Sequence, residues 1–347
     1  MKGNAMIARL ALGLFAVLLS TLSSHAQSVE DFYRGKSIQL LIAQSAGGNY
    51  DLNARLLARH ISKHIPGNPT IVPQNFVGAA GLRLANFLFK VAPKDGTTIG
   101  MVSRGTAMEP LLGNSAAQYD SRHYTWLGSV SDETSLCVTW HTSKIKTFDD
   151  MLSIPFVVGG QGSASDNDMF AYMLHNVFGA KVRVVPGYPG GNEINLAMER
   201  GEVDGRCGWS WGAVKTTRAD WLASKKINLV LQNALERASD LPKTVPLIMD
   251  RARNDRERQI LRLIFSRQQM AWPFAAPPDL PADRAAALRT AFDATMKDPD
   301  YVAEAHKRKV EVNPMSGLAI AQLVSELYAA PPDILAATRA AISGGSK

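Results

Sequence analysis

The chain is poor in the residues that cross-link a protein or bind a metal. Only two of its 347 residues are cysteine, Cys137 and Cys207, and no CxxC or Cys/His spacing accompanies them. A cysteine-based metal site is therefore not expected. If the chain is exported to an oxidising compartment, two interpretations stay open: a disulfide, which requires that both cysteines lie on neighbouring strands, or two buried free thiols.

Catalytic motifs are missing as well. The sequence contains no GxSxG elbow and no HExxH motif, and its seven histidines are dispersed. His60 and His64 have the i, i+4 spacing of a metal pair, but no carboxylate lies between them to act as a base. A polar helix flank is the simpler interpretation. We therefore expect no catalytic residues, no metal and no cofactor.

The unbroken hydrophobic run lies at the N-terminus. Lys2 and Arg9 precede an apolar core from Leu10 to Leu19, and the small-residue site Ser24-His25-Ala26 follows. This order is typical of a secretory signal peptide cut after Ala26. An uncleaved membrane anchor is the alternative, but the core is about half of the ~20 residues that a span needs. We predict an exported chain with no membrane insertion after cleavage.

Positive charge is present but not concentrated. Loss of residues 1–26 removes Lys2 and Arg9 and lowers the formal net charge from +7 to +5. The densest group, "HKRK" at His306 to Lys309, has no interleaved aromatic residues. A solvated helix face explains it better than a nucleic-acid site, so no nucleic-acid partner is expected.

Apolar segments alternate with helical patterns along the rest of the chain. The expected strands cover residues 37–43, 70–75, 96–102, 155–160, 181–185, 203–211 and 226–232. Glycine loops and helices separate them, which predicts an α/β fold of parallel strands. Pro73 removes a ladder donor, so its strand should end early or lie at a sheet edge.

Five loops each follow a strand, contain glycine and open a helix. They are Ser45 to Asp51, Gly78 to Gly81, Arg104 to Thr106, Gly162 to Asp166, and Tyr188 to Asn192. Such loops gather at the carboxyl edge of a sheet, where helix N-termini favour anions. A single loop is as well explained by a structural turn. All five would converge on one ligand if two lobes faced each other.

Six further residues, in three sets of two, have two interpretations each. Arg104 would bind a carboxylate bidentately or pair with Glu109. Arg206 lies in an apolar strand, where it requires a ligand or a partner such as Asp204 on the same sheet face.

The other two sets are aromatic and acidic. Trp209 and Trp211 would wall a pocket or belong to the core. Asp166 and Asp168 would act as paired carboxylates, or more simply complement a helix dipole.

The loops resemble, in order and spacing, those of the Bug family, the periplasmic solute-binding proteins of tripartite tricarboxylate transporters. The matching segments are "LLIAQSAGGNYDLNARLLARH", "QNFVGAAG", "VAPKDGTTIG", "GGQGSASD", "GYPGGN", "ERGEVD" and "APPDLPADRAAALRTAFDATMKDPD". They extend from about residue 30 to 330.

This resemblance implies a type II periplasmic-binding fold, with two α/β lobes, a ligand cleft between them and two chain crossings. We place the crossings near residues 128–138 and 226–232. The implied organisation is a signal peptide at 1–26, lobe 1 at 28–130 plus 230–347, and lobe 2 at 131–229.

The resemblance also implies a carboxylate ligand held by backbone amides and bridging waters. With the five loops, it predicts a binding set of Ser45, Ala46, Gly47, Gly48, Asn49, Tyr50, Asp51, Gly78, Ala79, Ala80, Gly81, Arg104, Gly105, Gly162, Ser163, Ala164, Ser165, Asp166, Tyr188, Gly190 and Trp209. The chain departs from the family pattern at Asn49-Tyr50, Asn167-Asp168 and Gly208. An aromatic or amide-bearing acid therefore matches the predicted set as well as a tricarboxylate does.

The function predicted is that of a periplasmic, monomeric receptor for a small organic acid, which it delivers to a two-subunit membrane permease. Two alternatives are a periplasmic enzyme on a related fold and a ligand-binding sensor. The enzyme would need a nucleophile and a base in the cleft, and the dispersed histidines argue against it.

Overall fold

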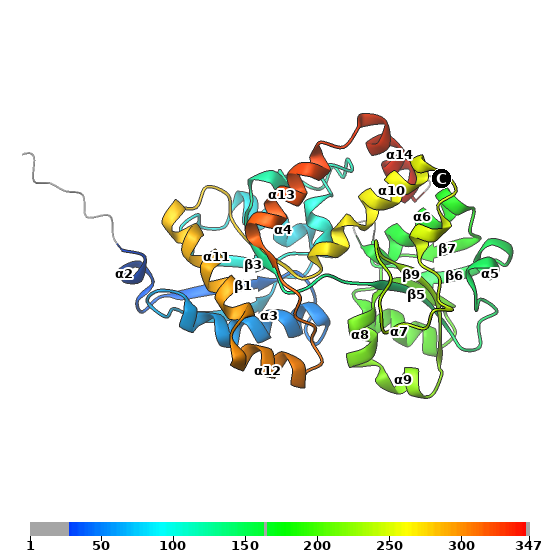
Figure 1. Cartoon of the computed structure of the whole chain (residues 1–347), viewed down its shortest axis with the longest axis horizontal. Coiled ribbons are helices and arrows are strands. Elements are labelled where there is room, and N and C mark those ends of the chain that lie inside the picture. The colour runs from blue at the N-terminus through cyan, green and yellow to red at the C-terminus, as the bar shows by residue number, and fades with distance from the viewer. Residues whose placement is uncertain (1–27, 163–164, 345–347) are drawn as a thin grey trace, which may run out of the picture.

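The protein consists of two α/β lobes lying side by side in this computed structural model (Figure 1). The structure describes residues 28–162 and 165–344. The predicted signal peptide, Ser163 and Ala164 lie outside the described residues. No helix in the described part of the chain has both the length and the apolar character needed to cross a membrane.

The first lobe is a six-stranded mixed sheet in the order β11-β4-β10-β3-β1-β2. Its strands are β1 (Ser37–Ile42), β2 (Thr70–Asn75), β3 (Thr98–Met101), β4 (Thr125–Ser129), β10 (Pro273–Ala276) and β11 (Met315–Ser316). Its α-helices are α2 (Val29–Tyr33), α3 (Asn49–His60), α4 (Leu82–Lys90), α11 (Ala282–Met296), α12 (Pro299–Lys307) and α13 (Gly317–Tyr328).

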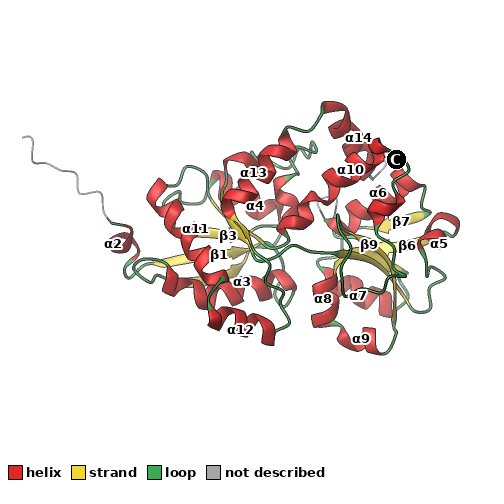
Figure 2. Ribbon diagram, viewed as in Figure 1, coloured by secondary structure: helices red, strands yellow, loops and turns green. Residues whose placement is uncertain are grey.

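The second lobe is a five-stranded mixed sheet in the order β7-β6-β8-β5-β9 (Figure 2). Its strands are β5 (Ser135–Trp140), β6 (Phe156–Gly159), β7 (Val182–Val185), β8 (Gly205–Ser210) and β9 (Ile227–Asn233). Its helices are α5 (Phe148–Ser153), α6 (Asp166–Phe178), α7 (Gly191–Glu199), α8 (Trp211–Thr217), α9 (Ala219–Ala223), α10 (Asp255–Phe265) and α14 (Pro332–Ile342). Short 3-10 turns are η1 (Ile61–His64), η2 (Ala79–Gly81), η3 (Arg104–Ala107), η4 (Ser121–His123), η5 (Ile248–Arg251) and η6 (Ser266–Met270).

Strand β1 lies inside the first sheet, as its apolar sequence predicts. It pairs in parallel with β2 on one side and β3 on the other. Leu40 and Ile42 belong to the core cluster on one face, and Leu41 belongs to the cluster on the opposite face. Strand β2 is the edge strand, which is the place that Pro73 predicted.

The chain crosses between the lobes at residues 130–134, within the range predicted for the first crossing. The second crossing was predicted at residues 226–232, and this was wrong. Those residues form most of β9, which pairs along β5 inside the second sheet. The chain returns to the first sheet only after α10 and η6, at β10.

The C-terminal half of the chain is shared between the two lobes. Ile260 and Ile264 of α10 and Ala341 of α14 lie in a core cluster of the second lobe. Both helices are drawn above the second sheet in Figure 1. The predicted lobe boundaries, taken as limits of folding units, stay a prediction. By their packing, α10 and α14, which belong to residues 230–347, lie with the second lobe. An amphipathic helix pattern reveals a buried face without revealing which sheet covers it.

Cys137 and Cys207 form a disulfide between β5 and β8. The two strands are antiparallel neighbours in the second sheet, so the condition set by the sequence analysis is met. The free-thiol interpretation is wrong. The bond joins the strand that leaves the crossing to the strand that carries Arg206.

The disulfide encloses 70 residues, and its loss should destabilise the second lobe. The double variant Cys137→Ser/Cys207→Ser is expected to lose roughly 4 kcal/mol of unfolding free energy, because the unfolded chain regains the entropy of an open loop. Urea unfolding followed by tryptophan fluorescence measures this. Dithiothreitol should reproduce the loss in the wild type and leave the double variant unchanged; equal midpoints for both proteins would refute the stabilising role.

Candidate functional site

A cavity of about 160 Å³ lies between the two lobes. All five predicted loops contribute at least one lining residue. The predicted residues that line it are Ser45, Gly47, Gly48, Asn49, Tyr50, Ala80, Arg104, Gly105, Ser165, Asp166, Gly190 and Trp209. Those that do not are Ala46, Asp51, Gly78, Ala79, Gly81, Gly162 and Tyr188. We call this cavity the cleft; binding by its residues stays a prediction.

The first-lobe wall is organised by Asp51, which lies beneath the loop and not in the cleft. Its Oδ2 accepts a hydrogen bond from the Gly47 amide at 3.1 Å, and Oδ1 accepts from Arg55 and Asn75. Burial alone would raise the pKa of Asp51, but these hydrogen bonds lower it below its ordinary value. Asp51 therefore stays ionised and fixes the glycine turn.

The turn ends at Gly48, the N-cap of the twelve-residue helix α3. No described residue accepts a hydrogen bond from the amides of Asn49 or Tyr50, the first two residues of that helix. Unpaired amides at a helix N-terminus carry partial positive charge. This wall of the cleft therefore favours an anion, whereas the Gly47 amide is already used by Asp51.

Asp168 plays the matching part in the second lobe. Its Oδ2 accepts hydrogen bonds from the amides of Gln161 and Gly162 at 2.7 and 3.0 Å, and from Ser165 Oγ at 2.7 Å. Burial raises the pKa of Asp168 although these bonds oppose the shift. The residue shapes the loop that precedes α6. Asp166 faces elsewhere, so the two do not form a carboxylate pair.

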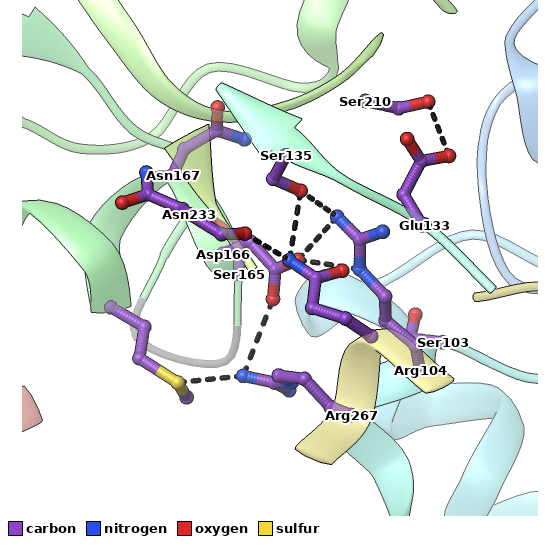
Figure 3. A network of polar contacts seen from close by, with 12 residues as sticks. Ser103, Arg104, Glu133, Ser135, Ser165, Asp166, Asn167, Ser210, Asn233 and Arg267 are labelled. Carbon is purple, nitrogen blue, oxygen red and sulfur yellow. Dashed lines mark hydrogen bonds and ion pairs between the residues drawn. The ribbon is translucent and has the colours of Figure 1, made fainter. Parts of the chain in front are cut away.

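A buried ion pair between Arg104 and Asp166 joins the lobes (Figure 3). Arg104 comes from η3 of the first lobe and Asp166 from the start of α6; their side chains are 8% exposed. Arg104 Nη2 also donates to Ser135 Oγ at 3.0 Å, and Arg267 Nη1 lies 3.3 Å from Asp166 Oδ1.

Asp166 determines how much positive charge Arg104 presents to the cleft. Burial alone would lower the pKa of Arg104, but the adjacent carboxylate of Asp166 raises it above its ordinary value. Pairing with Glu109, the alternative from the sequence, is wrong: Glu109 lies 3.9 Å from Arg267 instead. Arg104 lines the cleft, but its charge is already neutralised.

Arg206 has the opposite environment. The sequence suggested Asp204 as its partner, and this was wrong. Asp204 accepts hydrogen bonds from the Val157 amide and Ser143 Oγ. Arg206 is 5% exposed and lines the cleft. A positive charge inside an apolar strand was the sequence signal for this residue, although the predicted binding set omitted it.

Aromatic side chains form part of the cleft walls. The Tyr50 ring packs edge-on against Trp272, with ring centroids 4.9 Å apart, and its hydroxyl accepts a hydrogen bond from the Arg104 amide at 3.1 Å. Trp209 and Trp211 both belong to a core cluster of the second lobe, and of the two only Trp209 also lines the cleft. The lobes meet closely at one rim: a Cβ added to Gly190 would lie 3.2 Å from Ser45 Oγ.

The predicted set missed lining residues from several elements. They are Gln44, Ser103, Gln161, Asn167, Gly191, Asn192, Asn195, Arg206, Gly208, Ser210, Ala213, Thr217 and Trp272. Gln44, Ser103, Gln161 and Asn167 adjoin a predicted loop, and Gly191 and Asn192 lie inside one. Trp272 lies far from all of them in sequence, and only the return of the chain to β10 brings it to the cleft.

Steric constraints explain why position 208 is a glycine. Its φ is +76°, and a Cβ there would lie 2.7 Å from Asp166 backbone and side-chain atoms. A larger residue would push α6 away from β8 and displace Asp166 from Arg104. The departure from the family pattern at Gly208 is thus coupled to the interlobe ion pair.

The histidine pair, His60 in α3 and His64 in η1, forms hydrogen bonds with carboxylates of α12 and its N-cap. His60 Nε2 lies 2.7 Å from Glu304, and His64 Nε2 lies 2.7 Å from Asp298. No cluster of three or more metal-ligating side chains occurs among residues 28–162 and 165–344. The two histidines join α3 and η1 to α12 on the first lobe, away from the cleft.

Comparison with known proteins identifies the fold. No family model matches the chain. It is 25% identical over 291 residues to a UPF0065 protein of Agrobacterium vitis, covering 82% of this chain and 78% of that protein.

Three solved structures share the arrangement. The periplasmic binding protein BugD has a TM-score of 0.70 at 18% identity, covering 89% of this chain and 98% of that one. A protein of R. palustris with adipate has a TM-score of 0.68 at 17% identity, covering 88% and 97%. MatC of Rhodopseudomonas palustris, with bound malate, has a TM-score of 0.67 at 19% identity, covering 86% and 99%. The chain therefore has the two-lobed fold of the Bug-type periplasmic binding proteins, and the resemblance seen in the loops is confirmed.

The Asp166→Asn variant tests the interlobe ion pair. It would leave Arg104 and Arg267 buried without their shared carboxylate, so we expect a loss of about 3–5 kcal/mol of unfolding free energy. We also expect a larger radius of gyration by small-angle X-ray scattering, because the lobes lose a contact. Asp250→Asn is the control: Asp250 pairs with Arg237 at the surface at 2.8 Å, and its loss should cost at most about 1 kcal/mol. Equal losses in both variants would refute the special role of Asp166.

Proposed function

We propose that this chain is a periplasmic solute-binding receptor that captures a small organic acid by closure of its two lobes. One observation carries the proposal: a cleft between the lobes is lined by the N-terminal ends of α3, α6 and α7. Helix N-termini bind anions through unpaired amides and the helix dipole. The printed descriptions of two proteins with this fold, with adipate and with malate, agree with a carboxylate ligand.

The receptor acts without catalysis in this proposal. No histidine lines the cleft in the described part of the chain. Asp166, the acidic residue that lines it, is engaged by Arg104 and Arg267. A carboxylate held in a buried ion pair with two guanidinium groups is a weak general base, because their positive charges favour its ionised form. The proposal includes transport, in which a two-subunit permease receives the ligand. It also includes export through a cleaved signal peptide to the periplasm and a monomeric state of the exported chain.

A thermal-shift screen tests the proposal. We expect at least one compound among mono-, di- and tricarboxylates, aromatic acids and amino acids to raise the melting temperature. A ligand at 100 times its dissociation constant adds roughly 2.7 kcal/mol of stability. If no compound shifts the melt while the protein turns over one of them, the enzyme alternative replaces this proposal.

The Gly48→Val variant tests whether the glycine turn belongs to the site. Its φ is −86°, and a Cβ there would meet only Ser45 O at 3.7 Å, so the fold tolerates a side chain. The branched valine would occupy the space beside the free amides, and we expect the ligand-induced shift to disappear. Gly48→Ala is the matched control and should retain part of the shift. Undiminished affinity in folded Gly48→Val would remove this turn from the site.

A further inference from the structure

Arg206 is a buried cation whose hydrogen-bond partners are all neutral. Its Nε donates to Asn167 Oδ1 at 3.1 Å, and its Nη1 donates to Gly191 O at 2.9 Å and Asn195 Oδ1 at 3.1 Å. No described residue offers it a carboxylate. A buried charge of this kind is costly unless something of opposite sign compensates it.

The guanidinium is held in a fixed position at the cleft wall. It lies over the Trp209 ring, 4.9 Å from the ring centroid. Gly191, at the start of the nine-residue helix α7, permits the close approach, because a Cβ there would lie 2.6 Å from Nη1. No described residue accepts a hydrogen bond from Nη2. The side chain therefore has one free donor group and little freedom to move.

The electrostatics of this wall are positive. Burial, followed by the positive charge of Arg218, lowers the pKa of Arg206 to about 9. Arg206 remains protonated at neutral pH, and the N-terminal end of α7 adds partial positive charge beside it. Of the two arginines in the cleft, Arg104 is neutralised by Asp166, so Arg206 supplies the uncompensated charge.

The opposite wall, from the first lobe, presents the free amides of Asn49 and Tyr50. The cleft thus has two anion-favouring features, one on each lobe. A ligand with one acid group can satisfy one of them, whereas a ligand with two acid groups can satisfy both and draw the lobes together.

We propose that Arg206 binds the second acid group of a dianionic ligand and so makes this receptor selective for diacids over monoacids of equal chain length. This inference rests on the proposed function, since it assigns a residue and a specificity to the same cleft. The pair formed would be a charge-assisted hydrogen bond from the guanidinium to a carboxylate.

Isothermal titration of the exported chain with matched acids tests the inference. The probes are succinate, glutarate and adipate, each compared with its monoacid: butyrate, pentanoate and hexanoate. We expect the wild type to bind at least one diacid more tightly than its monoacid. Arg206→Gln should weaken that diacid on the order of 30-fold, as expected for a lost hydrogen bond to a charged group, and should abolish the preference.

Two further variants show whether a loss of affinity comes from the direct contact of Arg206 with the ligand, from the loss of a positive charge near the cleft, or from a folding defect. Arg218→Gln removes the neighbouring charge; Arg218 contacts Trp221 and Thr217 and does not line the cleft, so it should change affinity less than about threefold. Arg206→Lys keeps the charge without the planar fork and should retain a weakened preference for the diacid. It also serves if Arg206→Gln fails to fold.

The outcomes are distinguishable. A folded Arg206→Gln that keeps the wild-type preference overturns this inference while the proposed function stands. So does an Arg206→Lys that binds diacid and monoacid alike. If the wild type binds none of the acids, here or in the wider screen, the proposed function fails and the inference fails with it.

Discussion

The buried ion pair between Arg104 and Asp166 is the interaction on which the cleft depends. It takes one charge from each lobe and buries both, with Arg267 behind them. Because an isolated buried charge is so costly, either residue in a separated lobe would need water or another partner. The ion pair therefore couples the relative position of the lobes to the electrostatics of the space between them. Gly208 contributes to this coupling, because it lets β8 pack closely against α6 and so fixes the position of Asp166.

The ion pair also decides which arginine remains available. Two guanidinium groups line the cleft, and both are more than nine-tenths buried. Asp166 neutralises Arg104, whereas the hydrogen bonds of Arg206 go to neutral amide and carbonyl oxygens. The positive potential of the cleft is thus concentrated on the second-lobe wall and on the N-terminus of α3. A cleft built in this way attracts anions at two separated places.

Both lobes use the same device to shape their loops. An aspartate in the first turn of a helix, Asp51 in α3 and Asp168 in α6, accepts hydrogen bonds from backbone amides of the loop before it. Each carboxylate complements the dipole of its helix and holds the loop against the sheet. The amides of Gly47, Gln161 and Gly162 are thus fixed by hydrogen bonds in the structure as it stands.

The sequence by itself determined β1, β2, β3, β6, β7, β8 and β9, the edge position of β2 and the five glycine loops, because local periodicity and backbone restrictions act over a few residues. It did not predict β4, β5, β10 and β11, and its expectation of parallel strands was wrong for β5, which pairs antiparallel with β8 and β9. Only the tertiary structure decided the pairing of charges. Arg104 pairs with Asp166, which lies 62 residues away in sequence and in the other lobe. The candidates nearby in sequence, Glu109 for Arg104 and Asp204 for Arg206, contact other residues. The same limit explains the misplaced second crossing: α10 has an apolar face that either sheet could cover. Local sequence identifies which side chains need a partner, and the packing of distant segments determines which partner each one receives.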